Sequence, residues 1–182
     1  STPCEDCDAG KYSGVGKSEC TQCPKGKADT DKDASTPCKA CGVGTFASAG
    51  ATSCPQCASG EADLDKDAST KCKACGVGTF SKAGATACEK CAAGKADKDQ
   101  KQSTPCEDCS AGTYSAAGKT ECLECSKGKA DTDKNPGTPC KACATGTYAS
   151  AGVTTCTDCA KGTADLDKNA ATQCQTCSTG TY

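Results

Sequence analysis

Large hydrophobic residues are scarce in this chain and occur one at a time. Its 182 residues contain three Leu, four Val, two Phe and four Tyr, and no Ile, Met or Trp. No stretch has the apolar spacing of an amphipathic helix, and no apolar run approaches the length of a membrane span. Glycine recurs throughout, so the pattern predicts short irregular strands and turns, without helices or long sheets.

Cysteine, in contrast, recurs at fixed intervals. The 22 cysteines form eleven C-x-x-C pairs, from Cys4/Cys7 to Cys174/Cys177, separated alternately by 12 and 14 residues. This 34-residue period divides the chain into repeats at 1–34, 35–68, 69–102, 103–136 and 137–170, with a partial repeat at 171–182. Helical TPR arrays share the period but require an apolar stripe, which is absent here. The pattern begins and ends within a repeat, so we expect a segment of a longer array, flanked by further repeats.

The shorter linker follows the motif C-x-x-G-x-[YF]-x-x-x-G-x-x-x-C. Its two glycines are expected in tight turns, the first with a positive φ. They are Gly10, Gly44, Gly78, Gly112 and Gly146 at the first position, and Gly16, Gly50, Gly84, Gly118 and Gly152 at the second. We expect the aromatic residue to pack across the neighbouring disulfide as a miniature core, with ligand stacking as the alternative. These residues are Tyr12, Phe46, Phe80, Tyr114 and Tyr148.

With so little apolar surface, the chain must be ordered by covalent links or by metal. Cys₄ zinc sites tolerate this spacing. However, each such site uses two C-x-x-C pairs, so eleven pairs would leave one pair without a site, and the chain has no His. Thiol–disulfide catalysis normally uses one C-x-x-C beside a βαβ unit, which is absent here. A cysteine content this high is typical of a structural disulfide scaffold.

Spacing alone leaves two disulfide connectivities open. One interlocks alternate cysteines, Cys4–Cys20 with Cys7–Cys23. The other is a ladder that leaves Cys4 and Cys177 to pair with flanking repeats, and we favour it because the interlocked pattern leaves one C-x-x-C pair without partners. Each rung of the ladder closes a loop of about 15 residues, which contributes about 3 kcal/mol as an upper bound. Its rungs are Cys7–Cys20, Cys23–Cys38, Cys41–Cys54, Cys57–Cys72, Cys75–Cys88, Cys91–Cys106, Cys109–Cys122, Cys125–Cys140, Cys143–Cys156 and Cys159–Cys174. The predicted fold is therefore a small disulfide-rich, elongated tandem-repeat rod of irregular loops and short β-strands, without a large hydrophobic core.

The longer linker carries acidic residues with the spacing D-x-D-x-[DN]. This is the spacing of the first three ligands in a calcium loop, although the EF-hand Gly and Glu that complete such a site are missing. Weak calcium binding is one hypothesis, and solvated Asx-turns neutralised by Lys are the other. The positions are Asp29, Asp31, Asp33, Asp63, Asp65, Asp67, Asp131, Asp133, Asn135, Asp165, Asp167 and Asn169. The third copy departs from the pattern, with Lys101 in the third position.

Charge and composition argue against several classes of function. The net charge is −2, and all 21 basic residues are Lys, so there is no basic footprint for nucleic acid and no polybasic membrane patch. No His, no nucleophile beside a base and no carboxylate pair in an apolar pocket is apparent. We therefore expect no enzyme activity and no cofactor other than the hypothetical calcium.

The motif C-x-x-G-x-[YF] followed by G-x-x-x-C-x-x-C resembles the cysteine-rich repeats of TNF receptors and the ephrin-receptor-like tandem repeats. Ephrin-receptor-like repeats occur in large extracellular animal proteins and in long arrays in algal and protist surface proteins. In TNF receptors this module closes a loop between its first two cysteines, so the resemblance implies Cys7–Cys20. The acidic loops depart from the TNF-receptor pattern, and the uniform repeat is more similar to the protist arrays.

These features together predict an extracellular or cell-surface structural protein, such as a stalk, coat, adhesive element or filament. The alternative is a receptor-like ectodomain that binds a protein ligand. The many small residues would also allow self-association into fibres and O-linked glycans.

Overall fold

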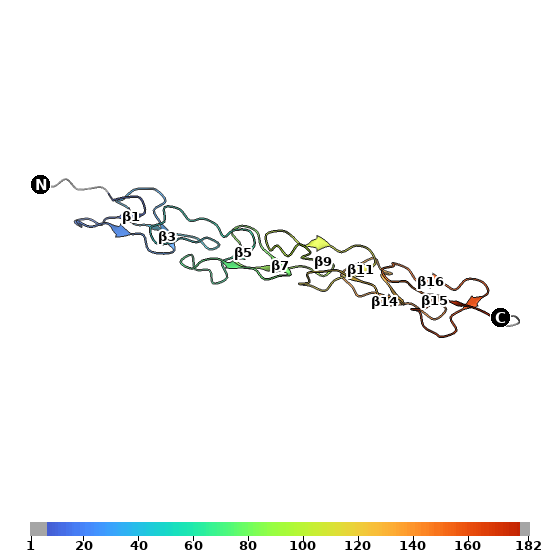
Figure 1. Cartoon of the computed structure of the whole chain (residues 1–182). Helices are drawn as coiled ribbons and strands as arrows, with labels where there is room; N and C mark the ends of the chain where they lie inside the picture. Colours follow the sequence, from blue (N-terminus) through green and yellow to red (C-terminus); the bar gives the residue numbers. More distant parts are fainter. Residues whose placement is uncertain (1–6, 179–182) are drawn as a thin grey trace. The chain divides into compact units, whose positions relative to one another are not determined.

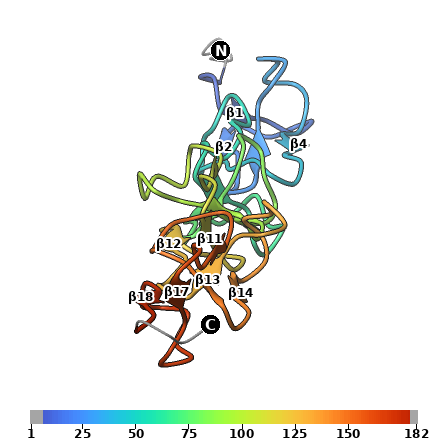
Figure 2. The same ribbon diagram turned by 90° about the vertical axis from the view of Figure 1, so that its right-hand side faces the viewer.

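The computed structural model of the chain describes residues 7–178, which contain no helix and eighteen two-residue strands (Figure 1). The strands form nine separate antiparallel pairs, and loops make up most of the ribbon in both views (Figure 1 and Figure 2). The pairs are β1 (Lys11–Tyr12) with β2 (Thr21–Gln22), β3 (Lys27–Ala28) with β4 (Lys39–Ala40), β5 (Glu61–Ala62) with β6 (Lys73–Ala74), β7 (Thr79–Phe80) with β8 (Glu89–Lys90), β9 (Lys95–Ala96) with β10 (Glu107–Asp108), β11 (Thr113–Tyr114) with β12 (Leu123–Glu124), β13 (Lys129–Ala130) with β14 (Lys141–Ala142), β15 (Thr147–Tyr148) with β16 (Thr157–Asp158), and β17 (Thr163–Ala164) with β18 (Gln175–Thr176). The predicted disulfide-rich tandem repeat of short strands is confirmed.

Each hairpin is built from the C-x-x-C motif itself. The return strand consists of the two residues between the cysteines, as with β2 between Cys20 and Cys23. The first strand follows a turn in which the Lys11 N–H donates to Asp8 O at 3.1 Å and Gly10 has φ +83°. A positive φ at this third position is typical of a type II turn and favours glycine. All ten glycines predicted in turns have φ between 72° and 83°, as expected.

Ten disulfides join the second cysteine of each pair to the first cysteine of the next. This is the ladder, and the interlocked alternative is not formed. The bonds are Cys7–Cys20, Cys23–Cys38, Cys41–Cys54, Cys57–Cys72, Cys75–Cys88, Cys91–Cys106, Cys109–Cys122, Cys125–Cys140, Cys143–Cys156 and Cys159–Cys174. Cys177 is a free thiol within the described residues, and Cys4 lies outside them.

The chain separates into two compact units. In the described region, one contains residues 7–76, 80–89 and 101–104, and the other contains 77–79, 90–100 and 105–178. Neither unit is a whole number of repeats, because the division passes through residues 69–102. Among the described residues, no helix has the length and apolarity needed to cross a bilayer.

The buried positions are occupied by small side chains. The largest fully buried side chains are Cys23, Cys57, Cys91, Cys125 and Ser115, and Ala28, Ala62, Ala96 and Ala130 have no exposed surface. The aromatic residues are half-buried, and their packing across the neighbouring disulfide stays a prediction. The buried residue is instead the one that follows the aromatic: Ala47, Ser81, Ser115 and Ala149. Their carbonyls accept hydrogen bonds from Gly26, Gly60, Gly94 and Gly128 of the preceding repeat, so these small residues lie against its backbone.

Candidate functional site: the acidic loops and the junctions between repeats

A disulfide and a strand pair span each boundary between consecutive repeats, as Cys57–Cys72 and β5–β6 do. Three further backbone hydrogen bonds connect consecutive repeats, and we call this set of three a junction. At the first junction, the Gly26 N–H donates to Ala47 O, the Gly50 N–H to Cys23 O and the Asp29 N–H to Ala51 O. The same bonds recur at three further junctions: Gly60 to Ser81, Gly84 to Cys57 and Asp63 to Ala85; Gly94 to Ser115, Gly118 to Cys91 and Asp97 to Lys119; and Gly128 to Ala149, Gly152 to Cys125 and Asp131 to Val153. All twelve bonds measure 2.8–3.1 Å. Since only backbone atoms take part, one geometry serves repeats of different sequence.

The junctions bring backbone from neighbouring repeats into direct contact. A Cβ atom added at Gly44 would collide with the carbonyl oxygen of Gly84, and one added at Gly10 would meet that of Gly50. The pairs Gly78/Gly118 and Gly112/Gly152 repeat this arrangement. The first glycine of the shorter linker is therefore required by the neighbouring repeat as well as by its own turn.

The first aspartate of each acidic loop forms a clasp between linkers. Asp63 is 3% exposed, and its Oδ2 accepts a 2.8 Å hydrogen bond from the Gly44 N–H while its Oδ1 accepts one of 3.1 Å from the Asp67 N–H. Its own N–H donates to Ala85 O across the junction. One residue thus connects the shorter linker of its repeat, its own loop and the following repeat. The equivalent bonds to Oδ2 are Gly10 to Asp29, Gly78 to Asp97, Gly112 to Asp131 and Gly146 to Asp165, at 2.9–3.2 Å.

Replacing Asp63 with alanine is expected to lower the free energy of unfolding by about 2–3 kcal/mol. The substitution leaves the buried Gly44 N–H without its acceptor and removes a second bond from the Asp67 N–H. Guanidinium denaturation with the disulfides intact measures the change. Asp65→Ala is the matched control, because Asp65 is exposed and bonds only within its own loop. Equal losses for the two variants would contradict the clasp.

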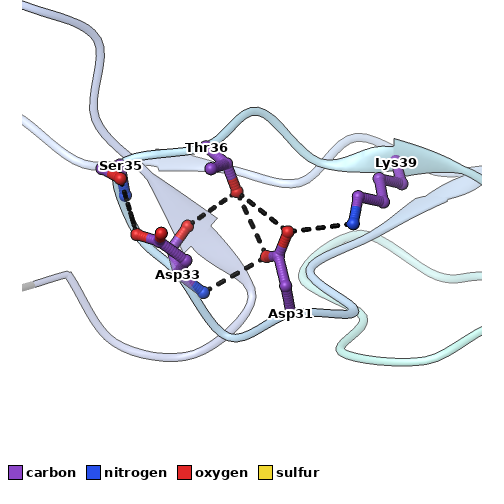
Figure 3. A network of polar contacts seen from close by, with 5 residues as sticks. All are labelled: Asp31, Asp33, Ser35, Thr36 and Lys39. Atoms are coloured by element: carbon purple, nitrogen blue, oxygen red, sulfur yellow. Dashed lines mark hydrogen bonds and ion pairs between the residues drawn. The ribbon is translucent and has the colours of Figure 1, made fainter.

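The second and third acidic residues bond within their own loop (Figure 3). Asp31 Oδ1 accepts hydrogen bonds from the Thr36 Oγ1 at 3.1 Å and from the Asp33 N–H at 3.3 Å, and Asp31 Oδ2 lies 3.0 Å from Lys39 Nζ. Asp33 Oδ1 accepts from both the N–H and the Oγ of Ser35, at 2.9 and 2.6 Å. These are Asx-turns with a neutralising lysine, as the second hypothesis predicts. Loops with the same Thr–carboxylate bonds contain Asp65, Asp133 and Asp167.

Hydrogen bonds and cationic neighbours stabilise the charged form of these exposed carboxylates. The pKa of Asp31 is lowered to about 2, chiefly by its hydrogen bond to Lys39 and then by the Asp33 N–H. The pKa of Asp133 is also lowered, first by the Asn135 N–H and next by Lys141. Thr70 and Thr172 are the main causes of the lowered pKa values of Asp65 and Asp167, and Ser35 is the main cause for Asp33.

Acid should therefore loosen the loops. Because the pKa of Asp31 is lower in the folded state than in the unfolded chain, its contribution to stability is present above about pH 4 and is lost as the pH falls toward 2. Carboxyl ¹³C NMR is expected to show Asp31 titrating near pH 2 and its midpoint rising in Lys39→Gln. Lys25→Gln, at an exposed lysine outside this network, should leave the midpoint unchanged. An ordinary midpoint for Asp31 in the unmodified chain would contradict the network.

The structure gives the twelve predicted calcium ligands separate roles. Asp29, Asp63, Asp131 and Asp165 turn toward the shorter linker, and the other eight positions lie in the Asx-turns. Within residues 7–178, no group of three or more acidic, His or Cys side chains is placed to hold a metal ion. The sequence analysis did not predict the clasp. The feature that could have revealed it is the Ala-Asp dipeptide that recurs in the longer linker within the motif G-x-A-D.

Calcium binding by these loops stays a prediction, and a titration tests it. If calcium completes a shell with backbone oxygens, millimolar calcium should raise the thermal unfolding midpoint, while magnesium at the same concentration should not. Asp65→Asn combined with Asp67→Asn should reduce the shift. An unchanged midpoint and hydrodynamic radius would count against the hypothesis.

Comparison of the chain with models of known protein families finds no match, and a search among curated proteins finds none either. The resemblance to ephrin-receptor-like repeats therefore rests on the cysteine and glycine spacing alone.

Proposed function

We propose that this chain is an extracellular structural spacer, a disulfide-stabilised stalk or surface coat that sets a distance. One observation carries the proposal: the same three-bond junction occurs four times with the same sequence separations. Units that bind only their neighbours through one repeated geometry add length in equal steps. Ten disulfides in a chain of this size favour an oxidising compartment, which supports location outside the cell or at its surface.

The exposed side chains favour a spacer over a ligand-binding ectodomain. Protein-binding hot spots are enriched in Trp, Tyr and Arg. The large hydrophobic residues exposed in the described region are single Val and Leu side chains: Val15, Val43, Leu64, Val77, Leu123 and Leu166. The acidic loops satisfy their carboxylates internally, which leaves them less to offer a charged ligand.

Small-angle X-ray scattering tests whether the repeats add length. The comparison is between this chain and a version in which residues 69–102 are duplicated in register. The maximum dimension is expected to increase by one repeat while the cross-sectional radius stays constant. Reduced and alkylated protein serves as the control and should lose the defined cross-section. A duplicated chain that grows in cross-section instead would refute the spacer.

Self-association into fibres, adhesion and O-linked glycans are further parts of this proposal. Their support is the abundance of Ala, Ser, Thr and Gly, which permits close lateral packing. Sedimentation at increasing concentration tests self-association, and intact mass of the protein from its native source tests glycosylation.

A further inference from the structure

Two of the four junctions contain an additional hydrogen bond. The Ser81 Oγ donates to Glu61 O at 2.9 Å, and the Ser115 Oγ donates to Lys95 O at the same distance. These bonds cross the second and third junctions, where the serines are only 3% and 2% exposed. At the first and fourth junctions the equivalent residues are Ala47 and Ala149, equally buried but without a hydroxyl group.

The acceptor carbonyl faces the next repeat at every junction. Glu61 pairs with Ala74 in its hairpin, and the neighbouring bond runs from the Cys75 N–H to Gly60 O at 2.8 Å. In an antiparallel ladder, the residue that follows such a bonded position directs its own carbonyl away from the partner strand. Lys27, paired with Ala40, and Lys129, paired with Ala142, occupy the same position as Glu61. At these two junctions the residue in the place of the serine is Ala47 or Ala149, which has no hydroxyl group to donate to the Lys27 or Lys129 carbonyl.

We propose that the array contains junctions of two strengths, and that the first and fourth junctions open before the second and third. The serine hydroxyl is the group that makes the difference. This order does not depend on what the chain does, but in a spacer under load it determines where yielding begins.

Other differences between the junctions do not follow the serine. Parallel β-bridges, Ala28 with Ala51 and Ala96 with Lys119, occur at the first and third junctions, one without and one with the hydroxyl. The arms of the β9–β10 hairpin are also joined by two ion pairs, Lys95–Asp108 at 2.7 Å and Lys98–Glu107 at 3.6 Å. Their side chains are 39–78% exposed, and exposed ion pairs contribute little. Both pairs connect the two arms of the β9–β10 hairpin, so they do not cross a junction. A buried hydrogen bond across the junction shifts a local opening equilibrium by about threefold to tenfold.

Amide hydrogen exchange measured by NMR on the intact chain tests the proposal. The Gly26 and Asp29 amides report on the first junction, and the Gly60 and Asp63 amides on the second. The second junction is expected to exchange about threefold to tenfold more slowly. Ala47→Ser should slow exchange at the first junction by a similar factor, and Ser81→Ala should accelerate it at the second.

Ser13→Ala is the matched control, because the Ser13 Oγ reaches only Gly14 O, its own neighbour, at 3.5 Å. It should leave exchange at every junction unchanged. The chain itself uses both Ala and Ser at the junction position, so the variants should fold. Equal exchange at all four junctions would overturn the proposal, as would an Ala47→Ser variant without effect. If Ser81→Ala accelerates exchange equally everywhere, the hydroxyl acts on global stability, and the local order of opening is wrong.

Discussion

Replacing Gly44 with alanine is expected to lower the free energy of unfolding by about 2–5 kcal/mol. Two costs combine in this value. Gly44 has φ +76°, a conformation that costs an L-residue roughly 1–2 kcal/mol. The added methyl group would also collide with the carbonyl oxygen of Gly84 in the next repeat, and relieving that overlap costs typically 1–3 kcal/mol.

Gly42→Ala provides the control within the same turn. Gly42 is exposed, its φ is not positive, and a Cβ atom there would have no neighbour within 4 Å. Guanidinium denaturation with intact disulfides should give a clearly lower free energy of unfolding for Gly44→Ala than for Gly42→Ala. Hydrogen exchange of the Gly84 amide, which donates to Cys57 O, should also accelerate in Gly44→Ala. Equal stability of the two variants would show that the repeats are not in contact at this glycine.

Removal of the Cys57–Cys72 disulfide is the second large effect. Changing both cysteines to serine is expected to cost about 4–6 kcal/mol. Loss of a loop closure of this length accounts for about 3 kcal/mol. The remainder arises because Cys57 is 2% exposed, so its replacement places a hydroxyl group where the sulfur was fully enclosed.

The Cys41–Cys54 disulfide provides the comparison. Its loop is nearly as long, with a separation of 13 residues against 15, but both of its cysteines are half-exposed. The double serine variant at this pair should therefore cost only the loop closure, about 3 kcal/mol. Urea or guanidinium midpoints measure both. If the two double variants are equally unstable, burial of the longer-linker cysteines contributes nothing.

The short strands and the turns were predictable because they depend on local chemistry. Two closely spaced cysteines, a glycine with a forced positive φ and the scarcity of apolar side chains act within a few residues of one another. The positions of Gly10 and Gly16 in turns, and the two-residue length of the strands within residues 7–178, follow from those local constraints. The 34-residue period likewise needs no knowledge of the fold.

The burial of the small residue beside each aromatic could not be predicted locally. Phe46 is half-buried, whereas Ala47 is 1% exposed and its carbonyl accepts a hydrogen bond from the Gly26 N–H of the preceding repeat. That burial depends on how closely the neighbouring repeat approaches, which the sequence of one repeat does not contain.

Cysteine spacing, glycine positions and composition were enough to predict the repeat, the turns and the dependence on disulfides. The three-dimensional arrangement was needed to distinguish the ladder from interlocked cysteines, because both closures satisfy the same spacing and differ only in which sulfurs meet in space. It also separated the acidic residues, assigning Asp63 to a buried clasp and Asp65 to an exposed turn. The physical reason is that the partners of Asp63 lie 19 residues earlier and 22 residues later in the chain, and folding alone brings them together.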